Sequence, residues 1–287
     1  MTIKHDVLNR YLFDDMHARG ELVQLESTFQ NIIAEHNYPV GVSQLLGELV
    51  TATCLLTATL KFEGEIAIQL QGDGPVSYIA VNGNHQQEMR GIARVLKETN
   101  AVGLSNLIGS GNMVITIRPD KGEAYQGVVS LEKDTIAECL AHYFEVSEQI
   151  PTKIWLFNDS KNQQVAGALV QLLPDSDDKD KQIQDFEHLC QLTNTLKTDE
   201  VFSLDAKTLL HRLYHQENVR LYDPQNVRFK CGCSQEKCLG AIAQIEPIEL
   251  KNILKEQGDV SMTCDYCKTT YVFDEFALAE FINETKH

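Results

Sequence analysis

Cys231-Gly-Cys233 and Cys264-Asp-Tyr-Cys267 are two close cysteine pairs separated by 30 residues. Four thiolates that arrive as two pairs can converge tetrahedrally on one Zn²⁺ at about 2.3 Å each, which makes a closed structural site. Such sites normally use Cys-x2–4-Cys at both ends, and Gly232 provides the backbone freedom that the tighter first pair requires. The spacing therefore predicts one zinc ion per chain, with Cys231, Cys233, Cys264 and Cys267 as its ligands.

The distribution of the cysteines separates the end of the chain from the rest. Three of the eight are scattered through the first 190 residues, and the other five lie within residues 231–287. We therefore expect a small C-terminal zinc-binding module over residues 231–287. Its fifth cysteine, Cys238, is a competing ligand, because Cys233-x4-Cys238 could also form half of a site. Otherwise Cys238 is a small residue on a helix predicted over 236–242.

Residues 1–174 are predicted to form an α+β domain, a mixed α/β body with a largely antiparallel sheet. Apolar residues at helical spacing predict three helices, the first with a cap at Ser27 and Thr28, and period-two alternation predicts seven strands. Short turns between successive strands imply antiparallel neighbours. The helices are predicted over 25–33, 42–53 and 134–147, and the strands over 66–70, 76–81, 89–95, 113–117, 125–129, 154–157 and 165–173.

Residues 175–230 are predicted to form a helical linker. It opens with a charge run, Asp175 to Lys181, of the kind that marks a domain boundary. Two amphipathic helices follow, the second with Asp205 as its expected N-cap. Because short helices are marginal in water by themselves, we expect the linker to be ordered only while its apolar faces are docked. These faces consist of Ile183, Phe186, Leu189, Cys190, Thr193 and Leu196 in the first helix and Leu209, Leu210, Leu213 and Tyr214 in the second.

The chain is strongly acidic, since 25 Lys+Arg against 41 Asp+Glu give a formal net charge of −16. We expect it to bind neither nucleic acid nor an anionic membrane, because both interactions depend on Lys and Arg. The N-terminus has no apolar run of signal-peptide length, and the densest apolar stretch, Ala52 to Leu60, is too short to span a bilayer. A cytoplasmic location is therefore expected, where cysteines are more often ligands or redox switches than permanent disulfides.

The C-terminal module has the features of a redox switch. Metal-bound thiolates stay deprotonated, and the thiolate is the form that oxidants attack. Adjacency pairs Cys231 with Cys233 and Cys264 with Cys267, so oxidation can close two local disulfides and eject the metal. A module of 57 residues has little core of its own, and structural zinc contributes roughly 10–16 kcal/mol to folding. Short disulfide loops replace little of that free energy, so oxidation is expected to unfold the module and release the linker helices.

Eight further motifs accompany the two cysteine pairs along nearly the whole chain. They are Arg10-Tyr-Leu-Phe13, Arg19-Gly-Glu-Leu-Val23, Leu55-Leu-Thr-Ala-Thr-Leu60, Ile68-Gln-Leu-Gln-Gly-Asp-Gly-Pro75, Met89-Arg-Gly-Ile-Ala-Arg94, Tyr125-Gln-Gly-Val-Val129, Arg212-Leu-Tyr-His215 and Tyr222-Asp-Pro224. With these motifs the chain resembles the 33 kDa chaperonin family, the redox-regulated heat-shock proteins of bacteria.

The resemblance implies an ATP-independent chaperone of the stress response, a holdase and not an enzyme. In that family the reduced, zinc-bound form is inactive. Carried over by position, it implies that oxidants convert Cys231 with Cys233 and Cys264 with Cys267 to disulfides and release the zinc. The C-terminal module and linker then unfold, and a homodimer binds unfolding client proteins.

Two functions of other classes remain as alternatives. A zinc-dependent hydrolase needs an open metal position and a general base. The one histidine pair at helical i,i+4 spacing, His211 and His215, has Arg212 where the H-E-x-x-H motif carries glutamate. The other alternative is a redox-inert interaction scaffold stabilised by zinc. The scattered cysteines, expected to pack in helix cores, are Cys54, Cys139 and Cys190.

Overall fold

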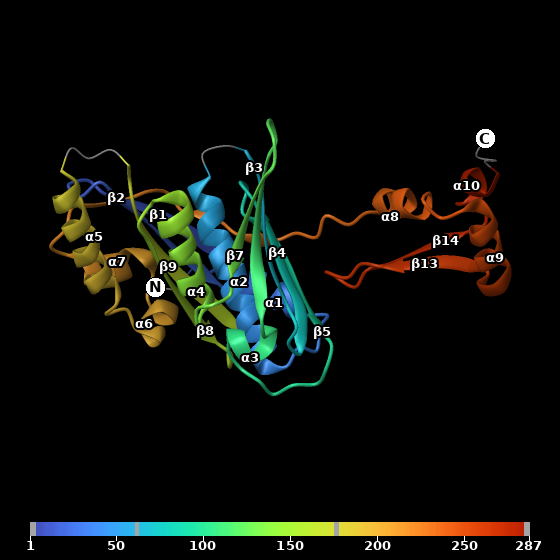
Figure 1. The fold of residues 1–287 in the computed structure, drawn as a ribbon, viewed down its shortest axis with the longest axis horizontal. Helices are drawn as coiled ribbons and strands as arrows, with labels where there is room; N and C mark the ends of the chain where they lie inside the picture. The colour runs from blue at the N-terminus through green and yellow to red at the C-terminus, as the bar shows by residue number, and fades with distance from the viewer. Residues whose placement is uncertain (1–3, 61–62, 175–177, 284–287) are drawn as a thin grey trace. The chain divides into compact units, whose positions relative to one another are not determined.

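The computed structural model describes residues 4–60, 63–174 and 178–283, which form two compact units. The first unit extends to Lys230 and the second begins at Cys231. The first combines two mainly antiparallel sheets with helices, which confirms the predicted α+β class (Figure 1). It contains the predicted body together with residues 178–230 of the predicted linker.

The first sheet has the strand order β10-β1-β2-β9-β8, with β11 pairing an additional part of β1. All of its pairings are antiparallel. Strands β8 and β9 were predicted from the sequence, but no strand was predicted before residue 66. The strands are β1 (Val7–Phe13), β2 (Ala18–Leu25), β8 (Thr152–Asp159), β9 (Gln164–Leu172), β10 (Val219–Leu221) and β11 (Gln225–Asn226).

The second sheet has the strand order β12-β5-β4-β3-β6-β7. Its pairings are antiparallel except that the short β12 runs parallel to β5. All five strands predicted between residues 66 and 129 are present. The strands are β3 (Gly64–Gly72), β4 (Val76–Asn84), β5 (Glu88–Val95), β6 (Gly111–Pro119), β7 (Tyr125–Ser130) and β12 (Arg228–Phe229).

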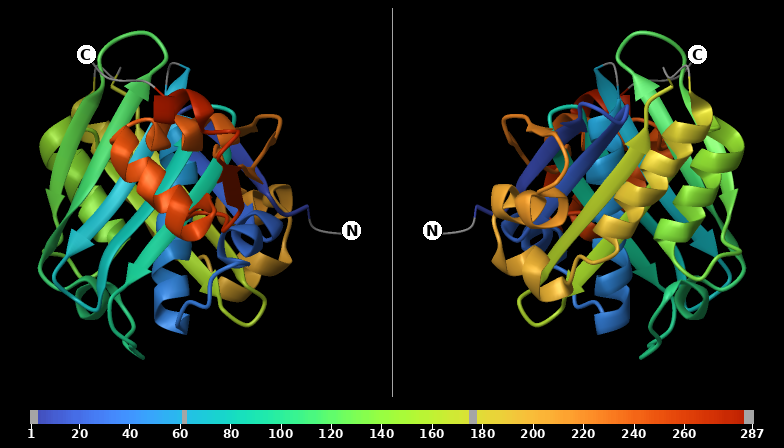
Figure 2. Two further views of the ribbon diagram at one scale, coloured as in Figure 1. Left: turned by 90° about the vertical axis from the view of Figure 1, so that its right-hand side faces the viewer. Right: turned by 90° about the vertical axis from the view of Figure 1, so that its left-hand side faces the viewer.

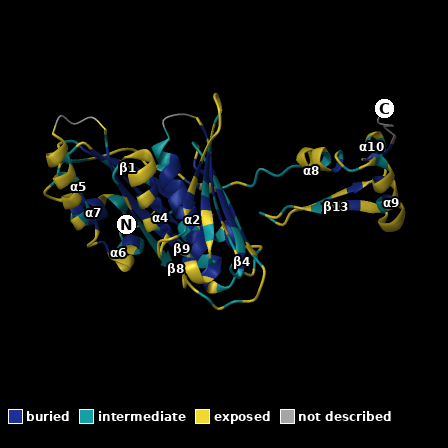
Figure 3. Cartoon of the chain, in the orientation of Figure 1, coloured by how far each residue is buried: buried dark blue, intermediate teal, exposed yellow. Residues whose placement is uncertain are grey.

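Helix α2 (Val40–Thr59) packs against strands of both sheets and forms the centre of the core (Figure 3). Three buried threonines interrupt its apolar sequence, and each hydroxyl donates to the backbone carbonyl four residues earlier. These bonds offset the cost of burying the hydroxyls. By length and composition α2 could cross a membrane, but 78% of its most apolar 18-residue stretch is buried within the protein. It is therefore accounted for as a core helix.

The remaining helices of the body differ from prediction at their ends. Helix α1 (Ser27–Ile33) was expected to be capped by Ser27 and Thr28, but the Asp6 carboxylate accepts the backbone N–H groups of Glu26, Ser27 and Thr28 instead. The helix predicted over 134–147 consists of α4 (Ile136–Tyr143), which a Thr135 capping box starts, and the π-helix η1 (Phe144–Glu148). One further short helix is α3 (Leu104–Ile108).

The linker contains three helices where two were predicted: α5 (Lys179–Thr193), α6 (Thr198–Ser203) and α7 (Ala206–Tyr214). They cover one face of the first sheet (Figure 2, right). Asp205 caps α7 as expected, through its bond from the Thr208 N–H. Ile183 was expected on the docked face but is 50% exposed, because α5 buries side chains only in its C-terminal half.

The second unit is small and has its own apolar core of seven buried side chains. Its two strands form an antiparallel hairpin, and the predicted helix over 236–242 is present as α8. The elements are α8 (Gln235–Ile242), α9 (Pro247–Gln257), β13 (Asp259–Thr263), β14 (Thr270–Asp274) and α10 (Ala279–Asn283).

Candidate metal centre

The four cysteines predicted as ligands lie together in the second unit. The Sγ atoms of Cys231, Cys233, Cys264 and Cys267 all lie within 4.8 Å of one another, so the group could hold a metal ion. The Sγ–Sγ distance is 3.6 Å between Cys231 and Cys264 and 3.5 Å between Cys233 and Cys267. Cys238 stands outside this group and packs on α8 against the core of the unit.

Local backbone structure positions each pair. The first pair precedes α8, whose N-terminus is capped by the Ser234 hydroxyl, and the Lys237 ammonium donates to the Gly232 carbonyl at 2.5 Å. The second pair occupies the turn between β13 and β14. That turn is closed by two backbone bonds of 2.9 Å, from the Cys264 N–H to the Thr269 carbonyl and from the Lys268 N–H to the Cys264 carbonyl.

Two hydroxyl groups from the same hairpin touch the sulfur atoms. The Tyr271 hydroxyl lies 3.2 Å from Cys233 Sγ, and the Thr269 hydroxyl lies 3.3 Å from Cys267 Sγ. Neither residue was predicted from the sequence. The available signal was their position: Thr269 ends the cysteine turn two residues after Cys267, and Tyr271 lies four residues after Cys267 in β14.

The sulfurs differ in acidity. Burial acts to raise the pKa of Cys267, but hydrogen bonds with the Thr269 side chain and backbone and with neighbouring cysteines outweigh it and lower that pKa to about 6. Burial is the main cause of a raised pKa for Cys231. The lowered pKa of Cys267 favours its thiolate, which is the form that binds metal.

The remaining cysteines of the first unit lie in different surroundings. Cys54 is fully buried on α2 and Cys139 on α4, and desolvation raises the pKa of both thiols. Cys190 on α5 is half-buried, and burial raises its pKa to about 11. These three thiols stay protonated at neutral pH, so they are poor nucleophiles and poor ligands.

The histidine pair considered for a hydrolase gives no support to that function. His211 on α7 and His215, the residue after its end, are both exposed, with ring centroids 6.3 Å apart. Both belong to the first unit, whereas the four-sulfur group belongs to the second. Within the described part of the chain, neither histidine nor a carboxylate joins that group.

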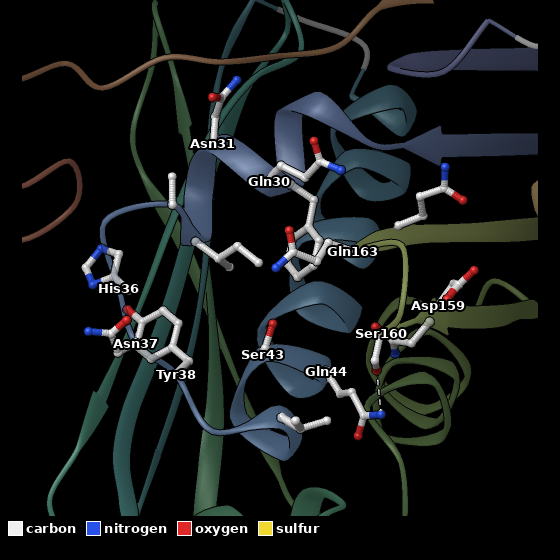
Figure 4. Close-up of a pocket in the computed structure, with 16 residues that line it drawn as sticks. Gln30, Asn31, His36, Asn37, Tyr38, Ser43, Gln44, Asp159, Ser160 and Gln163 are labelled. Atoms are coloured by element: carbon white, nitrogen blue, oxygen red, sulfur yellow. Dashed lines mark hydrogen bonds between the residues drawn. The ribbon is translucent and has the colours of Figure 1, made fainter.

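A cavity of about 540 Å³ opens in the first unit between α1, the start of α2 and the β8–β9 hairpin (Figure 4). Within it Gln44 donates to the Ser160 hydroxyl at 2.9 Å, and the His36 ring stacks on Tyr38. Its described lining residues include no cysteine, lysine or arginine. Its lining is rich in uncharged amide side chains: Gln30, Asn31, Asn37, Gln44, Asn158, Gln163 and Gln164.

A charged contact fastens the last residues of the first unit. The Glu88 carboxylate on β5 accepts from the Lys230 ammonium at 2.8 Å and from the Arg228 guanidinium. Hydrogen bonds, that from Lys230 foremost, lower the pKa of Glu88 to about 2. The contact anchors the chain immediately before Cys231.

Residues 6–274, which include all four clustered cysteines, match the family model described as Hsp33 protein. The chain belongs to the Hsp33 family. It is 66% identical over 286 residues to a 33 kDa chaperonin of Colwellia psychrerythraea, covering 98% of this chain and 99% of that protein. A 33 kDa chaperonin of Pseudoalteromonas translucida is 50% identical, covering 98% of this chain and all of that protein.

Among solved structures, the crystal structure of the 33 kDa chaperonin from Thermotoga maritima has the same fold. The TM-score is 0.81, over 97% of this chain and 98% of that one, at 23% sequence identity. The relatives are named chaperonins, so the family is one of chaperones. Unfolded client proteins are the partners that such a family implies.

Proposed function

We propose that this protein is a redox-regulated, ATP-independent holdase that is inactive while its four cysteines hold zinc. The observation that carries the proposal is the convergence of four sulfurs in the unit with the smallest core. On oxidation, Cys231 pairs with Cys233 and Cys264 with Cys267. The second unit and the linker then unfold and expose a surface for unfolding clients.

The sulfur geometry supports zinc as the ion. In a tetrahedron with Zn–S bonds of 2.3 Å, neighbouring sulfurs are about 3.8 Å apart. The two measured contacts, 3.5 and 3.6 Å, are close to this edge length. Among the described residues, no histidine or carboxylate joins the four sulfur donors, which suits a closed, structural site. When bound, the ion holds all four thiolates deprotonated and links the two pairs.

The size of the second unit supports unfolding as the consequence of metal loss. Within residues 231–282, its apolar core consists of seven buried side chains beside one two-stranded hairpin. A core of this size seldom stabilises a domain without a metal or a disulfide framework. Disulfides within Cys231–Cys233 and Cys264–Cys267 close very short loops, so they do not replace the link between the pairs.

The docked linker supports a masked binding surface. Buried side chains of α5, α6 and α7 pack on an apolar face of the first sheet. The Tyr214 and Phe13 rings meet edge to face, with their centroids 4.9 Å apart. Undocking exposes apolar area on both partners, which is the usual signature of a protein-binding surface. We propose three functional regions: the client-binding body 1–174, the masking linker 175–230 and the switch module 231–287. The active form is proposed to be a cytoplasmic homodimer.

The test measures bound zinc, free thiols and suppression of client aggregation in one sample, before and after peroxide with mild heat. The proposal expects one zinc ion per chain and no suppression in the reduced protein. After oxidation it expects loss of the zinc and of four thiols, with suppression of aggregation. Equal suppression by both forms, or full activity with the zinc retained, contradicts it.

A further inference from the structure

Two histidines meet on the exposed side of the last linker helix. His211 lies in the last turn of α7, and His215 follows at its C-cap with helical backbone angles, φ −63° and ψ −16°. Residues four apart on a helix are neighbours, with Cβ atoms about 5–6 Å apart. The two rings are accordingly adjacent, with their centroids 6.3 Å apart, and both residues are exposed. The fold of the linker thus brings two imidazole groups together.

The opposite side of α7 is the docked one, so a ligand of the two histidines does not compete with docking. The buried side chains on that side are Leu209, Leu210, Leu213 and Tyr214. We propose that His211 and His215 form a second, exchangeable zinc site, which helps to hold α7 helical and docked when it is occupied. The effect on activation rests on the proposed function, whereas the binding itself does not.

The surroundings of the pair favour a cation. The last carbonyl groups of a helix carry partial negative charge, and both histidines lie at this end of α7. The Glu217 carboxylate lines the same cavity of about 460 Å³ as the two histidines. Its position is fixed by His188, whose Nε2 lies 2.8 Å from the Glu217 Oε1. Lys207 also lines the cavity, but it is exposed, so its flexible chain can turn the ammonium group to water.

The ligand chemistry suits zinc. Imidazole is among its preferred ligands, and two histidines at this helical spacing bind zinc in other proteins. With Zn–N bonds of about 2.1 Å, the two nitrogens lie about 3.4 Å apart in a tetrahedral shell. Because both rings are exposed, side-chain rotation can bring them to this separation. Among the described residues, no third histidine, cysteine or carboxylate is grouped with the pair, so water completes the shell.

The small number of protein ligands makes this site weaker than the four-sulfur group. Protein dialysed free of excess zinc therefore retains only the ion of the four cysteines. Zinc bound by the pair stabilises the linker, because His211 and His215 are neighbours only while residues 211–215 are helical. At a free zinc concentration ten times the Kd, the equilibrium constant for unfolding α7 should fall about tenfold. Free zinc would thus oppose release of the linker.

The experiment titrates Zn²⁺ by calorimetry at pH 8 into the reduced, full-length protein, whose four-sulfur group is already loaded. The unmodified protein should bind one further zinc ion per chain. Loss of a group outside a ligand shell weakens metal binding about 10–100-fold, so loss of a ligand in His211→Gln or His215→Gln should weaken it at least as much. His142→Gln is the matched control, since His142 is exposed on α4 and should leave the second binding unchanged.

Hydrogen exchange of the same samples measures the effect on the linker. With the second site filled, protection of α7 should rise in the unmodified protein and in His142→Gln, but not in His215→Gln. The inference is overturned by absence of a second zinc ion, by adventitious binding that both histidine variants retain, or by binding that leaves the exchange of α7 unchanged. Neither measurement uses an oxidant, so the proposed redox function stands or fails separately, by its own test of oxidant-dependent zinc loss and client protection.

Discussion

The two units of this protein are stabilised in different ways. The first unit surrounds α2 with two sheets and covers a further face of one sheet with the linker, and it buries two large apolar clusters. The second has seven buried apolar side chains and a four-sulfur cluster. Burial of apolar area does not change with oxidant, whereas thiolate ligation does. We therefore expect the first unit to stay folded in the presence of oxidant and the second unit to respond to it.

The largest expected effect comes from removing two ligands. Cys231→Ser combined with Cys267→Ser should abolish zinc binding and unfold the second unit, because structural zinc contributes roughly 10–16 kcal/mol to folding. Metal analysis and NMR spectra of the reduced protein measure both consequences. Cys238→Ser is the matched control, since Cys238 lies outside the sulfur group and its loss should leave zinc bound. Stoichiometric zinc in the double variant would refute the ligand set.

The next largest effect tests whether the linker masks the client surface. Leu213→Glu places a charge in the buried contact between α7 and the first sheet, which should cost about 3 kcal/mol or more and undock the linker. Client aggregation should then be suppressed without oxidant. Ile183→Glu carries the same charge at a half-exposed position of α5 and should remain inactive until oxidised. Two variants that both need peroxide would show that masking is wrong.

A pH effect of intermediate size is expected in the first unit. Burial raises the pKa of Glu21 to about 7, and one of its oxygens has no hydrogen-bond partner. The folded state therefore binds more protons than the unfolded state between pH 4.5 and 7, so the free energy of unfolding falls as the pH rises through this range. Glu21→Gln should flatten this dependence and stabilise the protein at pH 8 by about 1–3 kcal/mol. Urea unfolding at several pH values measures the change, and an unchanged slope would contradict the assignment.

The smallest effect concerns the cap of α1. Asp6→Ala should destabilise the first unit by about 1 kcal/mol, because it removes the acceptor for three N–H groups. Ser27→Ala should cost less than about 0.5 kcal/mol, since Ser27 makes no side-chain cap bond. Equal losses of stability for the two variants in thermal unfolding would contradict the Asp6 cap and favour the predicted cap at Ser27.

The sequence predicted features that are encoded locally. Period-two alternation predicted β3 to β7. The cysteine spacing predicted that four sulfur atoms lie together, as they do in the structure. It missed β2, because one side of that strand faces α2 and the other faces the linker, so its residues are buried on both sides and do not alternate. Contacts between residues far apart in the sequence could not be predicted either. Examples are the cap that Asp6 forms on α1 and the contact of the Tyr271 hydroxyl with Cys233 Sγ.

We propose that oxidation of the clustered cysteines in the second unit releases the linker helices of the first unit. Hydrogen exchange of the full-length protein, zinc-loaded and after peroxide, tests it directly. We predict that oxidation removes protection from 231–283 and from the linker helices α5 to α7, while β3 to β6 and α2 stay protected. Loss of protection confined to 231–283, with α5 to α7 unchanged in a sample that binds clients, would contradict the account.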